Sequence, residues 1–199
     1  MSFHPQIPYQ TGQHRSERKL SPAGEAFAFT DERRARLEEV ASHYPPERRK
    51  SVVIFALFLV QEQVGYLSAS GMAHVAAVIG CTAAEVEDVA TYYAMFYKQP
   101  VGQYVVQVCR TLSCALLGAE RVTEEIATRL HVRPGETDAS GTFTLLEVEC
   151  LGACDRAPVV MVNDGWHERL DPKDVPALLE RVTREGERAL SGCVHKVET

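Results

Sequence analysis

The chain has 199 residues, of which 45% are hydrophobic, so it is long enough for one large globular domain or two small ones with ordinary buried cores. A formal net charge of −6 provides no basic field, which argues against nucleic-acid binding. The longest uninterrupted apolar run, Val52 to Val60, is too short to span a bilayer as a helix, so we expect no direct membrane insertion.

Residues 1–29 contain three prolines among polar and basic residues and show no apolar period, which predicts a flexible N-terminal tail. The basic residues of this tail are too few and too clustered for the Arg-rich amphipathic helix of a mitochondrial presequence. A bacterial cytoplasmic location is therefore favoured over the mitochondrial matrix.

Residues 30–98 have helical periodicity and predict a small antiparallel helical bundle. Four helices are expected, with breaks at Pro45-Pro46 and Gly65: Arg33 to His43, Lys50 to Val64, Ser68 to Ile79, and Thr82 to about Met95. Thr82 and Glu85 form a capping box at the start of the last helix. The apolar segment Val52 to Val60 is the expected centre of the bundle, and Cys81 is expected to be a small buried apolar residue rather than a metal ligand.

Four aromatic residues close the helical region: Tyr92, Tyr93, Phe96 and Tyr97. At helical spacing such a group favours core packing, and packing against the second domain or a partner chain is the alternative. Pro100-Val-Gly102 then breaks the helix and marks the domain boundary.

Residues 99–186 alternate between strand and helix patterns. The predicted elements are a strand at Tyr104 to Val108, a loop from Cys109 to Cys114, a helix from about Leu116 to Leu130, a strand at Phe143 to Val148, a loop from Cys150 to Cys154, a strand at Val159 to Val162, a short strand near Trp166, and a helix to about Arg184 that begins at Asp171 and Pro172. A turn is predicted at Asn163-Asp164-Gly165, in which Asp164-Gly165 is a hairpin signal because both residues tolerate a positive φ. The layout is a βαβ unit, a hairpin and a closing helix. Residues 187–199 are expected to be a polar C-terminal tail in which Cys193 is a free thiol.

Four of the six cysteines follow the two main predicted strands, as a C-x4-C pair (Cys109 and Cys114) and a distant C-x3-C pair (Cys150 and Cys154). Four thiolates held at the ends of neighbouring strands suit zinc or an iron-sulfur cluster. A plant-type ferredoxin would continue its C-x4-C into a nearby C-x2-C, which this chain does not do. We interpret the site as a 2Fe-2S cluster, and a zinc-stabilised interaction module with four cysteine ligands is the rival.

Other cysteine chemistry is disfavoured. The chain opens with no apolar signal segment, which argues against a disulfide framework. It contains no C-x-x-C, which argues against a dithiol oxidoreductase, and no histidine falls inside either cysteine cluster, which removes support for a Rieske centre.

Several motifs together are similar to the thioredoxin-like 2Fe-2S subunit of respiratory complex I, over about Leu37 to Val182. They are Tyr92-Tyr-Ala-Met-Phe96, Pro100-Val-Gly-Gln-Tyr104, Val108-Cys109, Leu146-Glu-Val-Glu-Cys-Leu-Gly-Ala-Cys154, and Ala157-Pro158. The resemblance implies an α+β chain, with the helical bundle followed by a thioredoxin-like α/β 2Fe-2S ferredoxin domain. Cys109, Cys114, Cys150 and Cys154 would be the cluster ligands. The family also implies a cis bond between Ala157 and Pro158.

The same resemblance implies an electron-transfer subunit of an NADH:quinone oxidoreductase, which exchanges single electrons with FMN on a partner subunit that binds NADH. A large iron-sulfur subunit would be a second partner, and the complex would hold the chain at the inner membrane. Equivalent subunits occur in NAD-reducing hydrogenases and formate dehydrogenases, and the motifs do not separate these hosts. The chain has no G-x-G-x-x-G after a strand and no P-loop, so hydride chemistry is assigned to a partner and the isolated chain is not expected to turn over.

Charged residues lie beside the ligands. Arg110 directly follows Cys109, and Arg156 lies two residues after Cys154. Their positive charges would stabilise a reduced cluster, although charges that flank ligands are more often simply solvated. The charged pair Asp155-Arg156 departs from the small or neutral residues that many members carry. This departure does not change the ligands and affects only the expected electrostatic field at the cluster. Gly152 is expected to let its loop approach the cluster or simply to make a turn.

Overall fold

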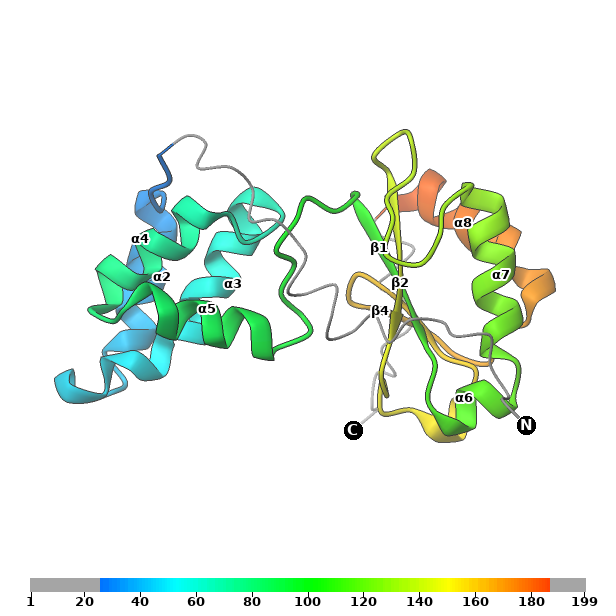
Figure 1. The fold of residues 1–199 in the computed structure, drawn as a ribbon, viewed down its shortest axis with the longest axis horizontal. Coiled ribbons are helices and arrows are strands. Elements are labelled where there is room, and N and C mark those ends of the chain that lie inside the picture. The colour runs from blue at the N-terminus through cyan, green and yellow to red at the C-terminus, as the bar shows by residue number, and fades with distance from the viewer. Residues whose placement is uncertain (1–25, 187–199) are drawn as a thin grey trace. The chain divides into compact units, whose positions relative to one another are not determined.

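The structure is a computed structural model that describes residues 26–186, and the chain divides into two compact units after Pro100 (Figure 1). The predicted tail 187–199 and residues 1–25 of the predicted N-terminal tail lie outside the described residues. Phe29 is buried in the core of the first unit and Phe27 packs against it. The packed unit therefore includes residues that the sequence assigned to the tail.

The first unit is helical. Its elements are α2 (Asp31–Ala41), the 3-10 helix η1 (Pro46–Val52), α3 (Val53–Val64), α4 (Ala69–Ile79) and α5 (Ala83–Tyr92). The side chains of Thr30, Ser68 and Thr82 cap α2, α4 and α5, and the predicted capping box of Thr82 with Glu85 is present. The predicted helix from Lys50 is divided, because its first turn belongs to η1 and the α-helix begins at Val53.

The core of the helical unit centres on α3, as the sequence predicts. Ala56, Leu57, Leu59 and Val60 are completely buried, whereas Phe58 on the opposite face is 40% exposed. No single helix within residues 26–186 is long and apolar enough to cross a bilayer, although α4 and α5 together, with a 119° bend between them, meet the same length and composition criteria. Both helices contribute buried side chains to the core of this unit.

The aromatic group at the end of α5 has mixed surroundings. Phe96 is buried in the helical core and Tyr93 packs against it, which confirms core packing for these two, but Tyr92 is 78% exposed. The predicted helix to Met95 is too long, because α5 ends at Tyr92 and Tyr93 is extended. The amide of Gln61 accounts for this end: it binds the Met95 carbonyl and the Tyr97 N–H, which ties a non-helical segment to α3.

The second unit is built on a four-stranded mixed sheet. Its elements are β1 (Tyr104–Cys109), α6 (Leu112–Leu116), α7 (Ala119–Leu130), β2 (Phe143–Val148), η2 (Cys154–Arg156), β3 (Val160–Val162), β4 (Gly165–His167), η3 (Pro172–Asp174) and α8 (Val175–Glu185). The strand order is β2-β1-β3-β4, in which β1 pairs with β2 in parallel and with β3 antiparallel, and β3 pairs antiparallel with β4. Figure 1 shows α7 and α8 side by side against this sheet. The predicted α+β fold is confirmed, and the four predicted strands follow one another along the chain as expected.

One helix prediction in this unit is wrong. The helix expected from Leu116 is two helices, because Gly118 has a left-handed φ of 97° that separates α6 from α7. The turn expected at Asn163-Asp164-Gly165 is present: Asn163 has a positive φ of 50°, and Gly165 is already paired with Val162 in the β3–β4 ladder.

Candidate metal centre

The four paired cysteines lie at one edge of the sheet. Cys109 is the last residue of β1 and its register partner is Val148, the last residue of β2, so Cys150 follows only two residues beyond that pair. Because parallel strands end at the same edge, both cysteine-bearing segments leave the sheet there. Cys114 lies on α6 rather than in a loop, and Cys154 begins η2.

The thiols form two pairs. The sulfurs of Cys150 and Cys154 are 3.7 Å apart, and Cys109 and Cys114 lie close enough for each to shift the pKa of the other. Cys114 and Cys154 are also close enough to influence each other electrostatically. Across the described residues no three Cys, His, Asp or Glu side chains surround one point that a single metal ion would fill. Two thiol pairs suit a two-iron cluster with two thiolates on each iron, whereas zinc draws four sulfurs to about 2.3 Å from one ion.

The two pairs differ in burial. Cys109 and Cys114 are each 2% exposed and belong to the hydrophobic core of the second unit, while Cys150 and Cys154 are exposed. One side of the site is therefore covered by the protein's own core, and the other side faces outward.

Donors to the sulfurs come from both loops. The Gly152 N–H donates to Cys150 Sγ at 3.3 Å, and the Thr111 hydroxyl lies 3.4 Å from Cys109 Sγ. Gly152 has a left-handed φ of 86°, which accounts for glycine at this turn. Such donors stabilise thiolates and tune an iron-sulfur site.

The pKa values of the two buried thiols, Cys109 and Cys114, shift in opposite directions. Burial disfavours the Cys109 thiolate, but hydrogen bonds from Thr111 and the Leu151 N–H outweigh it and lower the pKa of Cys109 below its usual value. Burial, followed by the hydrogen bond to Cys109, raises the pKa of Cys114 to about 11. Cys109 thus ionises more readily than Cys114.

Both arginines beside the paired cysteines form ion pairs with carboxylates. Arg110 Nη2 lies 2.9 Å from Glu149 Oε1, which joins the residue after Cys109 to the residue before Cys150. Arg156 Nε lies 3.0 Å from Asp155 Oδ2, and Arg156 Nη1 lies 3.0 Å from Glu168 Oε2. The positive charge of each arginine is therefore partly offset by a neighbouring carboxylate.

The predicted cis bond lies next to the site. The bond between Ala157 and Pro158 is cis, and the Val159 carbonyl accepts the Cys109 N–H beside it. The two other cysteines lie elsewhere: Cys81 packs against the helical core, where burial raises its pKa, and Cys193 lies outside the described residues.

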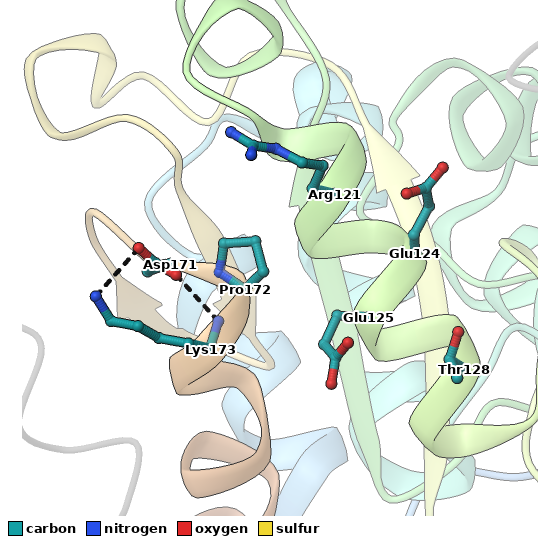
Figure 2. Close-up of a pocket in the computed structure, with 7 residues that line it drawn as sticks. All are labelled: Arg121, Glu124, Glu125, Thr128, Asp171, Pro172 and Lys173. Atoms are coloured by element: carbon teal, nitrogen blue, oxygen red, sulfur yellow. Dashed lines mark hydrogen bonds and ion pairs between the residues drawn. The ribbon is translucent and has the colours of Figure 1, made fainter.

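A cavity of about 580 Å³ lies between α7 and η3, and none of the paired cysteines lines it. Figure 2 shows its charged lining, which includes Arg121, Glu125 and Lys173.

Sequence reasoning missed the hydroxyl groups beside the sulfurs. Thr111 contacts Cys109 and Ser113 contacts Cys154, and both lie inside the first cysteine loop. A hydroxyl residue within a C-x4-C segment is a usable signal, because its side chain reaches only a short distance and the sulfurs are its nearest acceptors.

Residues 37–183 match the family of thioredoxin-like 2Fe-2S ferredoxins. The chain belongs to this family. Its cofactor is accordingly a 2Fe-2S cluster, and the interpretation made from the cysteine spacing is confirmed at the level of the cluster type.

Named relatives agree with the family. The chain is 39% identical over 158 residues to an E-type NADH-quinone oxidoreductase subunit of Rhizobium meliloti, in an alignment that covers 79% of this chain and 92% of the relative. It is 36% identical over 160 residues to the E-type NADH-quinone oxidoreductase subunit of Escherichia coli, covering 80% and 95%. A solved NAD+-reducing NiFe-hydrogenase in the air-oxidized state shares the fold, with a TM-score of 0.60 at 19% identity over 68% of this chain and 23% of that chain.

Proposed function

We propose that the chain is the 2Fe-2S electron-transfer subunit of an NADH:quinone oxidoreductase, and that it exchanges single electrons with FMN on a partner subunit. The observation that carries the proposal is the near full-length similarity to two subunits of such enzymes, at 36–39% identity over 92–95% of the relatives. The thiol pairs at the carboxyl edge of the sheet supply the groups that would bind the cluster.

Cys109 and Cys114 would hold one iron, and Cys150 and Cys154 the other. The separation of the thiols into a buried pair and an exposed pair supports this division. When bound, the cluster supplies a centre that gains and loses one electron. The chain's own groups shape that site: the Gly152 N–H and the Thr111 hydroxyl donate to sulfur, and the core around Cys114 excludes water from one side.

The exposed side of the site is bordered by apolar side chains of α6 and the residue after it. Leu112 is 75%, Leu116 77% and Leu117 58% exposed, and Ser113 of the same helix contacts Cys154. Exposed leucines gathered beside a site mark a surface that a partner covers. We assign this surface to the subunit that carries FMN and binds NADH. A large iron-sulfur subunit is the second proposed partner.

The location follows from the same proposal. The chain would be a peripheral subunit on the cytoplasmic side of a bacterial inner membrane, held there by its partners. An NAD-reducing hydrogenase or a formate dehydrogenase remains the alternative host, because the hydrogenase likeness shows a shared fold.

An absorption spectrum of the purified chain, with counts of iron, acid-labile sulfide and zinc, tests the cluster. A brown protein with two irons and two sulfides is expected, and a colourless protein with one zinc would refute the redox function. Alanine at Cys109, Cys114, Cys150 or Cys154 should remove or destabilise the cluster, while Cys81→Ala and Cys193→Ala should retain it. Full iron occupancy in Cys150→Ala would sink the ligand assignment.

Co-expression tests the host. The chain should co-purify with the flavin subunit of its own NADH:quinone oxidoreductase and restore electron transfer from NADH to that complex. Association with a hydrogenase or formate dehydrogenase flavin subunit instead would transfer the proposal to the alternative host.

A further inference from the structure

The ion pair between Arg110 and Glu149 occupies the point where the two ligand loops separate. Arg110 continues the β1–β2 ladder, since its N–H donates to the Val148 carbonyl at 3.0 Å. Its guanidinium then donates from Nη2 to Oε1 of Glu149, the residue directly after the end of β2, at 2.9 Å. Each partner is covalently adjacent to a proposed ligand, Cys109 or Cys150, so both charges lie within roughly 10 Å of the site, about one Debye length.

This ion pair contributes little to holding the two loops together. The Arg110 side chain is 25% exposed and the Glu149 side chain 58% exposed. Ion pairs that exposed add little to stability, because water screens the attraction and two long side chains lose freedom. The loops are already joined by the backbone hydrogen bond at Arg110 and by the parallel ladder below it. The larger consequence of the pair is therefore its effect on charge.

A cation near an iron-sulfur site favours the reduced form, which carries one more negative charge, and so raises the reduction potential. Arg110 alone would act in that direction. Glu149 places a compensating negative charge on the same guanidinium. Glu147 on β2 is also within electrostatic reach of Arg110, which adds to the acidic surroundings of that side chain.

We propose that Glu149 is a positioning residue that holds Arg110 beside the ligand loops and cancels its charge, and that the pair thereby keeps the reduction potential of the cluster lower than an unpaired Arg110 would allow. The inference rests on the proposed function, because it requires the cluster at Cys109, Cys114, Cys150 and Cys154.

A double-mutant cycle on the cluster-loaded full chain tests the cancellation. The readout is the midpoint potential from a redox titration followed by electron paramagnetic resonance, which does not depend on any partner. Glu149→Gln should shift the potential upward, and Arg110→Gln should shift it downward. The double variant should return close to the parent, because both charges are then absent. Arg110→Lys keeps the charge and should stay near the parent value.

The matched control is Glu125→Gln on α7, which removes a carboxylate from a surface ion pair of the same length, 2.9 Å to Arg129, in the same unit. It should leave the potential unchanged. The shifts at Glu149 and Arg110 should also shrink as salt is raised, because screening weakens exposed charges.

Three outcomes separate the possibilities. The inference is overturned if the cluster-loaded Glu149→Gln and Arg110→Gln variants both keep the midpoint potential of the parent. Loss of the cluster from Glu149→Gln would also overturn it, in favour of a bracing role. A parent chain that binds no 2Fe-2S cluster would refute the proposed function itself, which the parent spectrum shows before any variant is made.

Discussion

Asn163 extends the sheet with its side chain. Its amide oxygen accepts the Val105 N–H at 2.8 Å, its amide nitrogen donates to the Gln103 carbonyl at 3.1 Å, and its own N–H donates to the Val105 carbonyl at 3.0 Å. The antiparallel ladder between β1 and β3 ends at Val106 and Val162, so these bonds continue it beyond its last paired residues. The residue also adopts a φ of 50°, which asparagine tolerates better than most residues.

Replacing Asn163 should separate these two contributions. Asn163→Ala loses both side-chain hydrogen bonds and strains the turn, so it should lower the free energy of unfolding by about 1–3 kcal/mol. Asn163→Gly removes the same bonds but accepts the positive φ, so its loss should be smaller. Chemical denaturation of both variants provides the comparison, and equal losses would show that the backbone conformation contributes nothing.

His167 makes folding sensitive to acid. It is 6% exposed, and burial, assisted by the charge of Arg181, lowers its pKa to about 4. Because the unfolded chain titrates near 6.5, it takes up a proton between pH 6.5 and 4 that the folded chain excludes, so stability is lost as pH falls through that window. The contribution at pH 5 is about 2 kcal/mol relative to neutral pH.

His167→Gln should flatten this dependence. The variant has no proton to gain at this position, so the difference in unfolding free energy between parent and variant should narrow as pH falls from 7 to 5. Denaturant unfolding at both pH values measures it, and parallel curves for the two proteins would contradict the assignment.

Among the elements, α6 carries a buried cysteine on one side and exposed leucines on the other. Cys114 is 2% exposed while Leu116, two residues on, is 77% exposed. The helix is short because Gly118 ends it in the left-handed region.

Leu116→Ser should leave the cluster in place and weaken binding to the flavin subunit by roughly tenfold or more, since an exposed leucine has little to lose in the free chain and a covered one contributes about 1–3 kcal/mol. Co-purification and titration with that subunit are the measurements. Glu124→Ser on α7 is the control, because it changes an exposed side chain of the same unit that lies outside α6. Equal binding by the Leu116 variant and the parent would remove α6 from the interface.

The features that the sequence predicted correctly depend on residues close together in the chain or on periodic patterns. The capping box at Thr82 and Glu85 lies within four residues, and the apolar run around Leu57 marks a buried helix by composition alone. The strands β1 and β2 are short runs of β-branched and aromatic residues, and each ends where a cysteine pair begins.

The failures depend on contacts that sequence spacing does not contain. The end of α5 is set by Gln61, more than thirty positions earlier, and the pairing of Arg110 with Glu149 depends on the register of two strands. The positive φ of the hairpin turn is at Asn163 rather than at Asp164 or Gly165, and Asn163 makes bonds to β1 that a two-residue turn signal cannot include.

At the scale of the whole molecule, each unit has its own hydrophobic core. One core contains Leu57 and the other Val106, and no residue belongs to both. All four paired cysteines belong to the second unit. We propose that the helical unit docks the partner while the second unit presents its cluster.

A chain that begins at Val101 tests this division of labour. It should fold and remain brown, because the core around Val106 and the ligands are complete within it, but it should no longer co-purify with the flavin subunit. The helical unit, added separately, should compete with the full chain for that subunit. Binding of the shortened chain as tight as that of the full chain would show the docking role to be wrong, and failure to fold would show that the helical unit completes its core.

The connection between the units is anchored at both ends. Lys98 is buried and pairs with Glu87 and Thr91 in the helical unit, while the Gly102 N–H donates to Thr144 in the second unit. A Cβ on Gly102 would lie 2.8 Å from the Thr142 carbonyl oxygen, so this anchor requires glycine. Only residues 99–101 are left between the two anchors.

Such a connection acts as a short tether. Four Cα–Cα steps from Lys98 to Gly102 span at most about 15 Å, so once either unit is bound, the other is confined to a small volume around it. Its effective concentration there is at least of millimolar order, which makes the second contact with a partner an intramolecular event. A weak cluster-side contact, suited to rapid electron exchange, is thereby compatible with a subunit that stays in its complex.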